Sequence, residues 1–281
     1  MTKENKIIAG VVGDPISHSV SPLLHGYWLN KYGINGNYKA FHVAAENLPD
    51  FIAGLKENSI SGLNLTVPHK EQAIKLVDRV DERAQRIGAV NTIYFDKDGK
   101  AVGSNTDGIG FLAHLKQSSK KWTSKKGPAT IIGAGGAARA VLVSLLDDGV
   151  PEIRLTNRTK KRADNLAREL KDPRLKVIDW ADREDALEGT ALLVNVTTLG
   201  MTGQPELELS LGKLSKDATV YDIVYAPLET TLLKNARVNG NECIDGLGML
   251  LHQAAPGFEA WFGVKPDVDD GLRDYILKAL K

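Results

Sequence analysis

The 281-residue sequence has a single cysteine, Cys243, so no intrachain disulfide can form. One thiolate is also too few for a structural zinc site, and the six histidines are scattered without metal-ligand spacing. We therefore expect no metal, and a chemistry that relies on side chains or on an organic cofactor. Scarce cysteine is also typical of cytoplasmic proteins, and the cytoplasm is the location that we predict.

An excess of charge of either sign is missing as well. Lysine and arginine number 36 and aspartate and glutamate 35, so the formal net charge is +1. This balance gives no reason to expect nucleic acid or an acidic membrane as a partner. No apolar run approaches the roughly 20 residues that span a bilayer, and the polar residues 1–6 predict no signal segment. We expect small-molecule partners. A homodimer is compatible with the sequence.

Strand and helix patterns, by contrast, alternate along the whole chain. Asp98-Gly99 is a strong hairpin signal, and residues 117–128, rich in lysine and serine, form a polar connector after which the alternation restarts. Apolar strand patterns occupy residues 6–12, 37–43, 60–67, 91–95, 100–103, 129–132, 153–156, 191–196 and 219–223. Helical patterns occupy residues 22–32, 47–57, 71–77, 81–87, 105–115, 140–146, 163–170, 246–262 and 269–280.

The length and the restart of the pattern predict two α/β domains. We place residues 1–107, together with 246–281, in an N-terminal open α/β domain. Residues 108–245 form a second domain of the Rossmann type. A cleft between the two domains is expected to hold the reaction.

A glycine-rich turn follows the strand at 129–132 and opens a helix, as in the dinucleotide-binding fingerprint. The first glycine allows the tight turn, the second lets the backbone approach a pyrophosphate, and the helix N-terminus offers free N–H groups to it. A plain tight turn is the alternative, which the flanking strand and helix disfavour. The predicted cofactor-binding residues here are Gly133, Ala134, Gly135, Gly136 and Ala137.

The end of the next strand indicates which dinucleotide binds. An NAD site usually carries a carboxylate there for the ribose hydroxyls. This sequence instead has Asn157, Arg158 and Thr159, followed by further basic residues that include Arg162. An arginine can bind a 2′-phosphate through paired, charge-assisted hydrogen bonds. A solvated basic helix start is the alternative. Because these residues follow the fingerprint and its partner strand, we predict NADP rather than NAD.

The first domain carries further polar motifs. A serine-rich loop at 17–21 precedes a helix, where Ser21 either caps the helix or helps to bind an anion. Lys70 follows a strand's carboxyl end, where α/β sheets gather ligands, although a single lysine there is more often solvated. These motifs, in this order, resemble those of the shikimate dehydrogenase family over essentially the whole chain. The matching segments are Ser19 to Pro22, Asn64 to Lys70, Gly88 to Thr92, Asn105 to Gly108, Gly133 to Ala138, Asn157 to Thr159, and Asp245 to Leu250 with Gln253.

The resemblance implies an NADP-dependent shikimate dehydrogenase activity and a role for each matching residue. Lys70 and Asp107 would be the catalytic pair beside the reacting hydroxyl. Lys70 would act there either in proton transfer or by stabilising the developing alkoxide. The implied substrate-binding residues are Ser19, Ser21, Thr66, Asn91, Asp107, Tyr225 and Gln253. Gly246 and Met249 would lie near the nicotinamide, and Asn195, Thr197 and Thr198 near the cofactor backbone. The resemblance gives no chemistry to His18 and His69, which we interpret as structural.

Two alternatives stay open. A quinate/shikimate dehydrogenase with broader use of NAD and NADP would be expected to carry an acidic residue near the adenosine ribose. A non-catalytic sensor of NADP or shikimate would be expected to have lost its catalytic residues. The basic segment at Arg158 argues against the first, and the presence of Lys70 and Asp107 argues against the second.

Overall fold

The computed structural model describes residues 6–280, so the segment 1–5, for which no signal was predicted, lies outside the described residues. The chain divides into two compact units. Unit 1 comprises Met1–Thr106 with Leu251–Lys281, and unit 2 comprises Asp107–Leu250. Both units contain a sheet flanked by helices, which confirms the predicted α/β class.

Unit 1 contains a six-stranded mixed sheet in the order β2-β1-β3-β5-β6-β4. Its first three strands are parallel, while β5 runs antiparallel to both β3 and β6. The Asp98-Gly99 turn joins β5 to β6, which confirms the predicted hairpin. The strands are β1 (Ile7–Gly13), β2 (Gly36–His42), β3 (Ile60–Leu65), β4 (Arg79–Val80), β5 (Thr92–Phe95) and β6 (Ala101–Ser104).

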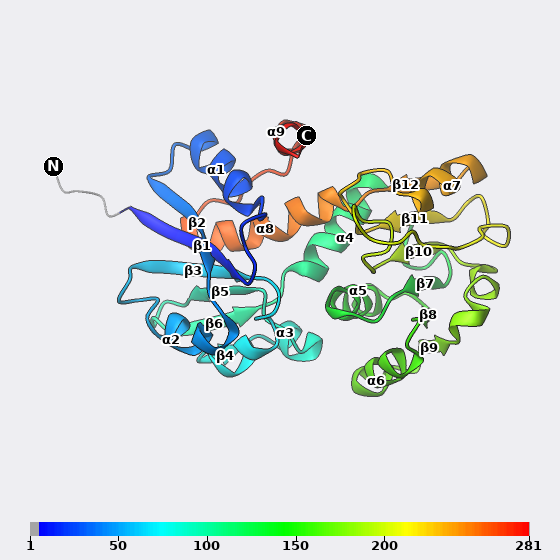
Figure 1. The fold of residues 1–281 in the computed structure, drawn as a ribbon, viewed down its shortest axis with the longest axis horizontal. Helices are drawn as coiled ribbons and strands as arrows, with labels where there is room; N and C mark the ends of the chain where they lie inside the picture. Colours follow the sequence, from blue (N-terminus) through cyan, green and yellow to red (C-terminus); the bar gives the residue numbers. More distant parts are fainter. Residues whose placement is uncertain (1–5, 281) are drawn as a thin grey trace. The chain divides into compact units, whose positions relative to one another are not determined.

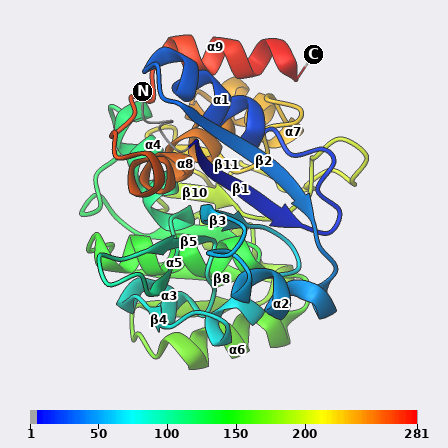
Figure 2. The ribbon, with the colours of Figure 1, turned by 90° about the vertical axis from the view of Figure 1, so that its left-hand side faces the viewer.

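Helices cover both faces of this sheet (Figure 1). The face with α2 (Leu48–Ala53) and α3 (Glu82–Ile87) buries an aliphatic core. The other face lies under α1 (Ser21–Lys31) and α8 (Leu247–Phe262), where an aromatic cluster packs around His25. Figure 2 shows α9 (Asp270–Ala279) beside α1, joined to it by the ring pair of Tyr27 and Tyr275.

Unit 2 contains a six-stranded parallel sheet in the order β12-β11-β10-β7-β8-β9. Counted from β7, this is the 3-2-1-4-5-6 order of the Rossmann fold, whose ligands bind where the order reverses. The reversal lies between β7 and β10, which are adjacent. The strands are β7 (Ala129–Ile132), β8 (Ile153–Thr156), β9 (Leu175–Ile178), β10 (Leu192–Asn195), β11 (Thr219–Asp222) and β12 (Glu242–Ile244).

Two cores hold this sheet in place. One face packs against α4 (Asp107–Ser118), α5 (Gly136–Asp147) and α6 (Lys160–Leu170). The other packs against α7 (Thr231–Asn239), the 3-10 helix η4 (Asp185–Leu187) and a run of buried leucines between residues 207 and 214. Burial on both faces explains why the strands are continuous apolar runs instead of alternating patterns.

Several local predictions are wrong. The pattern at 71–77 forms only the 3-10 helix η2 (Gln72–Lys75). The pattern at 47–57 gives η1 (Ala45–Asn47) followed by the short α2. Ser21 is the first residue of α1 and not its cap, which is Val20. The strands β4 and β12 were not predicted, because two or three residues carry too little periodicity. The four-residue strand β9 and the helix α7 were not predicted either.

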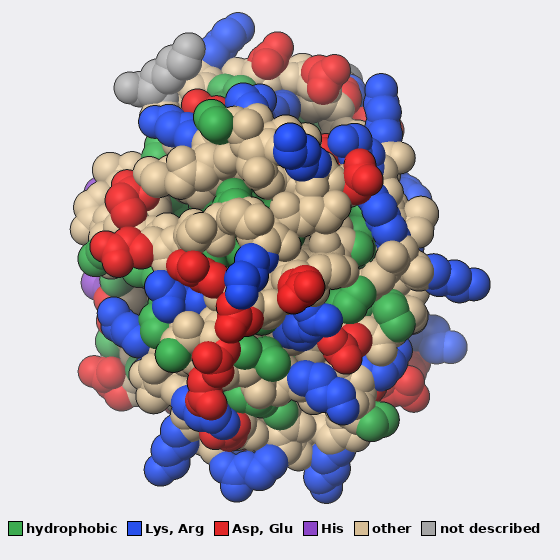
Figure 3. Space-filling model, turned by 90° about the vertical axis from the view of Figure 1, so that its right-hand side faces the viewer, with side chains coloured by type: hydrophobic (Ala, Val, Ile, Leu, Met, Phe, Trp, Pro, Cys, Tyr) green, Lys and Arg blue, Asp and Glu red, His purple; other side chains and the backbone are tan. Residues whose placement is uncertain are grey.

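Charged side chains of both signs are interspersed on the face shown in Figure 3, in keeping with the balanced composition. Within residues 6–280, no helix is long and apolar enough to cross a membrane. Within the same range, no group of three or more potential metal-ligating side chains is placed to hold a metal ion.

Candidate active site

Lys70 is half-buried in the turn that follows β3. The turn is anchored at both ends, because the Thr66 amide donates to the Val12 carbonyl at 3.0 Å and the Val90 amide donates to the Lys70 carbonyl at 2.8 Å. His69 is fully buried, and its Nε2 lies 2.8 Å from the Val43 carbonyl. A carbonyl only accepts, so this contact requires a proton on Nε2. His69 thus fixes the backbone on which Lys70 stands.

Asn91 and Thr106 form a second part of the same framework. The Asn91 Oδ1 accepts from the Thr106 amide at 2.9 Å, and the Asn91 Nδ2 donates to the Thr106 hydroxyl at 3.1 Å. Thr106 is followed directly by Asp107, the half-buried first residue of α4. The segment between Lys70 and Asp107 is thereby tied together through Val90 and Asn91, which are neighbours in the chain.

The other predicted substrate residues lie in three separate segments. Ser19 and Ser21 are half-buried before and at the start of α1, and the Ser21 amide donates to the Ser19 hydroxyl at 3.3 Å. Gln253 is half-buried on α8. Tyr225 follows β11 in unit 2, where burial raises the pKa of its phenol above the ordinary value.

The glycine-rich turn lies between β7 and α5, as the fingerprint requires. Gly133 has φ +118°, and a Cβ atom there would lie 2.7 Å from the Thr197 Cγ2, so only glycine fits. A Cβ atom on Gly135 or Gly136 would meet no atom within 4 Å, which leaves open space beside the start of α5. The turn therefore has one residue packed against the protein and two facing outward.

Asn157, just past β8, joins this turn to the start of α6. Its Oδ1 accepts from the Ala134 amide at 3.1 Å, and its Nδ2 donates to the Thr159 carbonyl at 2.9 Å. Arg158, Thr159 and Arg162 are exposed beside it. The first turn of α6 contains no acidic residue, and Lys160 pairs with Asp164 at 3.0 Å.

Asp222, fully buried at the end of β11, organises the loop that follows β10. It accepts from the Asn195 Nδ2 at 3.0 Å, while the Asn195 Oδ1 accepts from the Thr197 amide and hydroxyl at 3.1 and 2.7 Å. Burial raises the pKa of Asp222 to about 6, although the donor groups of Thr230, Val224 and Asn195 favour the charged form. Thr197 in turn packs against Gly133.

The start of α8 lies against the end of β11. The Gly246 amide donates to the Val224 carbonyl at 3.1 Å, and a Cβ atom on Gly246 would lie 1.9 Å from the Ile223 carbonyl oxygen. Gly246 is therefore required by packing alone. Met249 is 9% exposed and packs into the core of unit 2.

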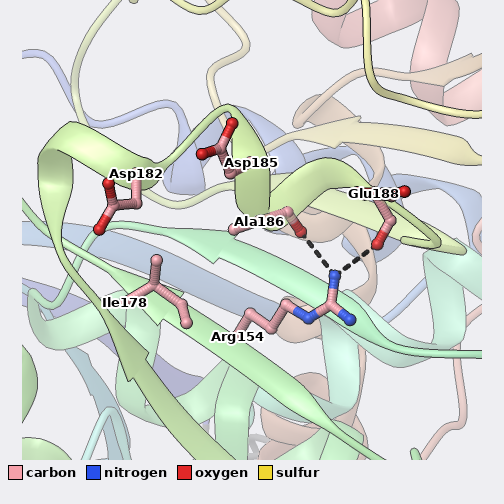
Figure 4. Close-up of a pocket in the computed structure, with 6 residues that line it drawn as sticks. All are labelled: Arg154, Ile178, Asp182, Asp185, Ala186 and Glu188. Carbon is pink, nitrogen blue, oxygen red and sulfur yellow. Dashed lines mark hydrogen bonds between the residues drawn. The ribbon is translucent and has the colours of Figure 1, made fainter.

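An open pocket of about 440 Å³ also occurs in unit 2, lined by Arg154, Ile178, Asp182, Asp185, Ala186 and Glu188 (Figure 4). The arginine of this pocket is Arg154 and not Arg158, the arginine of the predicted cofactor site. Arg154 donates through Nη1 to the carbonyls of Ala186 and Glu188 at 2.9 and 2.6 Å, and through Nε to the Glu152 carboxylate at 2.8 Å. These bonds tie η4 to β8, which gives Arg154 a structural role.

Sequence reasoning gave no role to Asn64, Thr92 or Asp222, which hold predicted site residues in place. For Asp222 a signal existed, since a carboxylate at the end of an apolar strand must find partners when it is buried. For Asn64 no local signal existed, because its partners Tyr38 and Thr92 lie on other strands. Thr92 bonds Asn64 on β3 and its own chain neighbour Asn91.

Comparison with known proteins assigns the chain to a family. A family model described as the shikimate dehydrogenase substrate binding domain matches residues 11–93. One described as shikimate / quinate 5-dehydrogenase matches residues 114–200, and one described as the shikimate 5′-dehydrogenase C-terminal domain matches residues 246–280.

Individual relatives match along nearly the full length. A shikimate dehydrogenase (NADP(+)) of Paramagnetospirillum magneticum is 55% identical over 270 residues, which is 96% of this chain and 98% of that protein. The crystal structure of shikimate 5-dehydrogenase from Thermus thermophilus in complex with NADP(H) and shikimate is 36% identical, with a TM-score of 0.85, covering 97% of this chain and 99% of that one. A quinate dehydrogenase of Corynebacterium glutamicum in complex with NAD is 30% identical, with a TM-score of 0.89 and the same coverage. The chain belongs to the shikimate dehydrogenase family.

Proposed function

We propose that this chain catalyses the reversible, NADP-dependent interconversion of shikimate and 3-dehydroshikimate, a step in aromatic amino-acid biosynthesis. The observation that carries the proposal is its similarity, at about half of all positions and over nearly the whole length, to enzymes of that name. Unit 1 would bind shikimate and unit 2 would bind NADP. The functional domains would be residues 1–107 with 246–281 and residues 108–245.

Oxidation of a secondary alcohol requires that a hydride leave carbon for the nicotinamide while the hydroxyl loses a proton. Lys70 and Asp107 are the pair proposed to act in the transfer of that proton. The hydrogen bonds from Val90 to Lys70 and from Thr106 to Asn91 support the assignment, because they fix the backbone beside both residues. A site that holds its acid–base groups on a rigid framework avoids reorganisation during the reaction.

The polyol acid would be held by neutral polar groups. Ser19 and Ser21 would bind the carboxylate with Tyr225, and Thr66, Asn91 and Gln253 would bind ring hydroxyls. Each hydroxyl that leaves water needs a partner, so a cage of hydroxyl and amide groups matches such a ligand.

The residues at the ends of β7 and β8 fit NADP. Gly133, Ala134, Gly135, Gly136 and Ala137 would hold the pyrophosphate at the start of α5, where open space lies beside two of the glycines. Asn157, Arg158, Thr159 and Arg162 would hold the 2′-phosphate. Cations at the N-terminus of α6 oppose the helix dipole, and a bound phosphate would offset that cost. Thr197, Gly246 and Met249 complete the proposed cofactor set.

The experiment that tests the catalytic role replaces Lys70 by alanine. The variant is expected to lose about 100-fold or more in kcat for shikimate oxidation, because general acid–base groups contribute on that order. Its dissociation constant for shikimate, measured by calorimetry, is expected to change by less than about tenfold, roughly one lost contact. Lys216→Ala, a change of an exposed lysine outside every proposed site, is the matched control. A Lys70→Ala enzyme with nearly unchanged kcat would contradict the assignment.

The broader-specificity alternative has a solved relative in the quinate dehydrogenase described above. Such an enzyme would be expected to carry an acidic residue near the adenosine ribose. Asp164, which follows the basic segment on α6, accepts a hydrogen bond from Lys160. Because this carboxylate is paired with a lysine, we keep NADP as the proposed cofactor. A cytoplasmic location and a homodimer stay predictions.

A further inference from the structure

The aromatic face of unit 1 contains a buried set of hydrogen bonds in which Asn91 is the one residue with a proposed direct role in substrate binding. It begins at Tyr38 on β2, whose ring stacks on His25 with centroids 3.8 Å apart and planes 5° from parallel. The Tyr38 hydroxyl donates to the Asn64 Oδ1 at 2.7 Å. Tyr38 is 5% exposed and Asn64 is 6% exposed, so water does not replace this bond. The series of hydrogen bonds thus starts from the packed ring of Tyr38.

The next links cross from β3 to β5. The Asn64 Nδ2 donates to the Asn91 carbonyl at 3.2 Å and to the Thr92 hydroxyl at 3.1 Å. The Thr92 hydroxyl donates to the Asn91 Oδ1 at 2.9 Å. That oxygen also accepts from the Thr106 amide, the bond that holds the residue before Asp107. Five buried residues in four segments therefore form one continuous set of hydrogen bonds.

The directions of these bonds follow from the chemistry of the groups. The Asn91 carbonyl is only an acceptor, so the Asn64 amide must present its nitrogen there and its oxygen to Tyr38. Thr92, which accepts from Asn64, then uses its single proton for the Asn91 Oδ1. Because that oxygen also meets the Thr106 amide, the orientation of the Asn91 side-chain amide is set: its oxygen faces the protein donors, and its nitrogen is the donor.

We propose that Tyr38, Asn64 and Thr92 are positioning residues that orient the Asn91 amide and fix the Thr106 backbone ahead of Asp107. The proposal rests on the proposed function, in which Asn91 binds a substrate hydroxyl. Asn91 then meets the substrate as a donor, so it binds a lone pair of a hydroxyl or carbonyl oxygen. Without the hydroxyl of Thr92 the amide loses one of the bonds that define its orientation.

The test replaces Thr92 by valine, which keeps the shape and removes the hydroxyl. Thr92→Val is expected to lower kcat/KM for shikimate about 5- to 100-fold, the range for a buried hydrogen bond lost beside the site. Its KM for NADP should stay within about twofold, since no cofactor residue is touched. Thr92→Ser restores the hydroxyl and should recover most of the activity.

Thr190→Val is the matched control, because Thr190 is a buried threonine whose hydroxyl bonds Thr130 and Ala186 in unit 2. It should lose thermal stability much as Thr92→Val does but keep kcat/KM within about twofold. Activity of Thr92→Val within twofold of the unmodified chain would overturn the proposal. So would a Thr92→Ser enzyme as defective as Thr92→Val, or an equal activity loss in Thr190→Val.

A second readout does not depend on turnover. The Thr106 amide should exchange its hydrogen slowly in the unmodified chain and in Thr92→Ser, and about tenfold or more faster in Thr92→Val. Unchanged protection in Thr92→Val would contradict the positioning role. An inactive unmodified chain would instead contradict the proposed function, and the exchange measurement would still decide the role of the network.

Discussion

At the scale of single residues, two of the three glycines of the fingerprint have different roles. Gly133 is held at φ +118° against Thr197, whereas Gly135 faces open space. The first is required by the protein's own packing, and the second leaves room for a ligand that approaches the backbone. One substitution at each position can therefore separate folding from cofactor binding.

Gly135→Ala is expected to leave the free energy of unfolding within about 1 kcal/mol of the original value, because its methyl group meets no protein atom. Its affinity for NADP should fall about tenfold or more as the methyl group displaces the pyrophosphate. Gly133→Ala should lower both, by about 1–3 kcal/mol in stability because of the strained backbone. Denaturant titration and fluorescence titration with NADPH measure the two effects. Tight NADPH binding by Gly135→Ala would contradict the proposed cofactor position.

At the scale of elements, the N-terminus of α6 departs from the usual preference for a side-chain cap and acidic residues in the first turn. Its cap is Thr159, which makes no side-chain capping bond, and its first turn holds Lys160, Lys161 and Arg162 without an acid. Cations there oppose the helix dipole, and a glutamate at position 162 would complete a capping box with Thr159. Sequences that break such rules without compensation tend to do so at functional sites.

Arg162→Glu is accordingly expected to stabilise the ligand-free protein by about 0.5–1 kcal/mol. It should weaken NADP binding about tenfold while changing NAD binding little, because only NADP carries the 2′-phosphate. Thermal melts and calorimetric titration with both nucleotides measure this. A variant that is less stable and binds NADP as before would contradict the assignment of α6.

Elements also differ in how well the sequence predicted them. The β7–turn–α5 unit and the β5–β6 hairpin were predicted because glycine signals mark their turns and apolar runs mark their strands. The pattern at 71–77 predicts a longer helix than the 3-10 helix η2, which ends where the Leu76 amide donates to the Ala73 carbonyl three residues earlier. The Tyr38–Asn64–Thr92 contacts join strands more than 25 residues apart along the chain, which no local pattern encodes. The roles of Lys70 and Asp107 came from family resemblance alone.

At the scale of the whole molecule, each unit contains a buried ionisable group. The group is a histidine in unit 1 and an aspartate in unit 2, and acid affects their contributions to stability in opposite directions. Burial lowers the pKa of His25 in unit 1 to about 3. The His25 side chain therefore stays neutral in the folded unit at pH values at which it binds a proton in the unfolded chain. Its contribution to stability is present above pH 6.5 and is lost as the pH falls toward 3. Burial raises the pKa of Asp222 in unit 2 to about 6. Its contribution is present below about pH 4 and is lost as the pH rises through 6.

Between pH 6 and pH 4, acid should therefore weaken unit 1 and strengthen unit 2. Each unit of pH in these windows is worth up to about 1.4 kcal/mol per group. Hydrogen exchange followed by mass spectrometry at several pH values, corrected for intrinsic rates, is expected to show protection falling in unit 1 relative to unit 2. His25→Phe, which keeps an aromatic ring against Tyr38, should flatten the trend in unit 1. An equal change in both units would contradict this assignment of acid sensitivity.

The proposed activity depends on substrate and cofactor together. Nicotinamide reduction by the purified chain, with shikimate or quinate crossed with NADP or NAD, tests it most directly. We expect turnover of shikimate with NADP. For the other three pairs we expect kcat/KM to be lower by at least about 100-fold, the scale of a lost charge-assisted phosphate contact or a mismatched polar group. Efficient turnover of quinate, or equal use of NAD, would contradict the proposed function, and so would the absence of turnover with every pair.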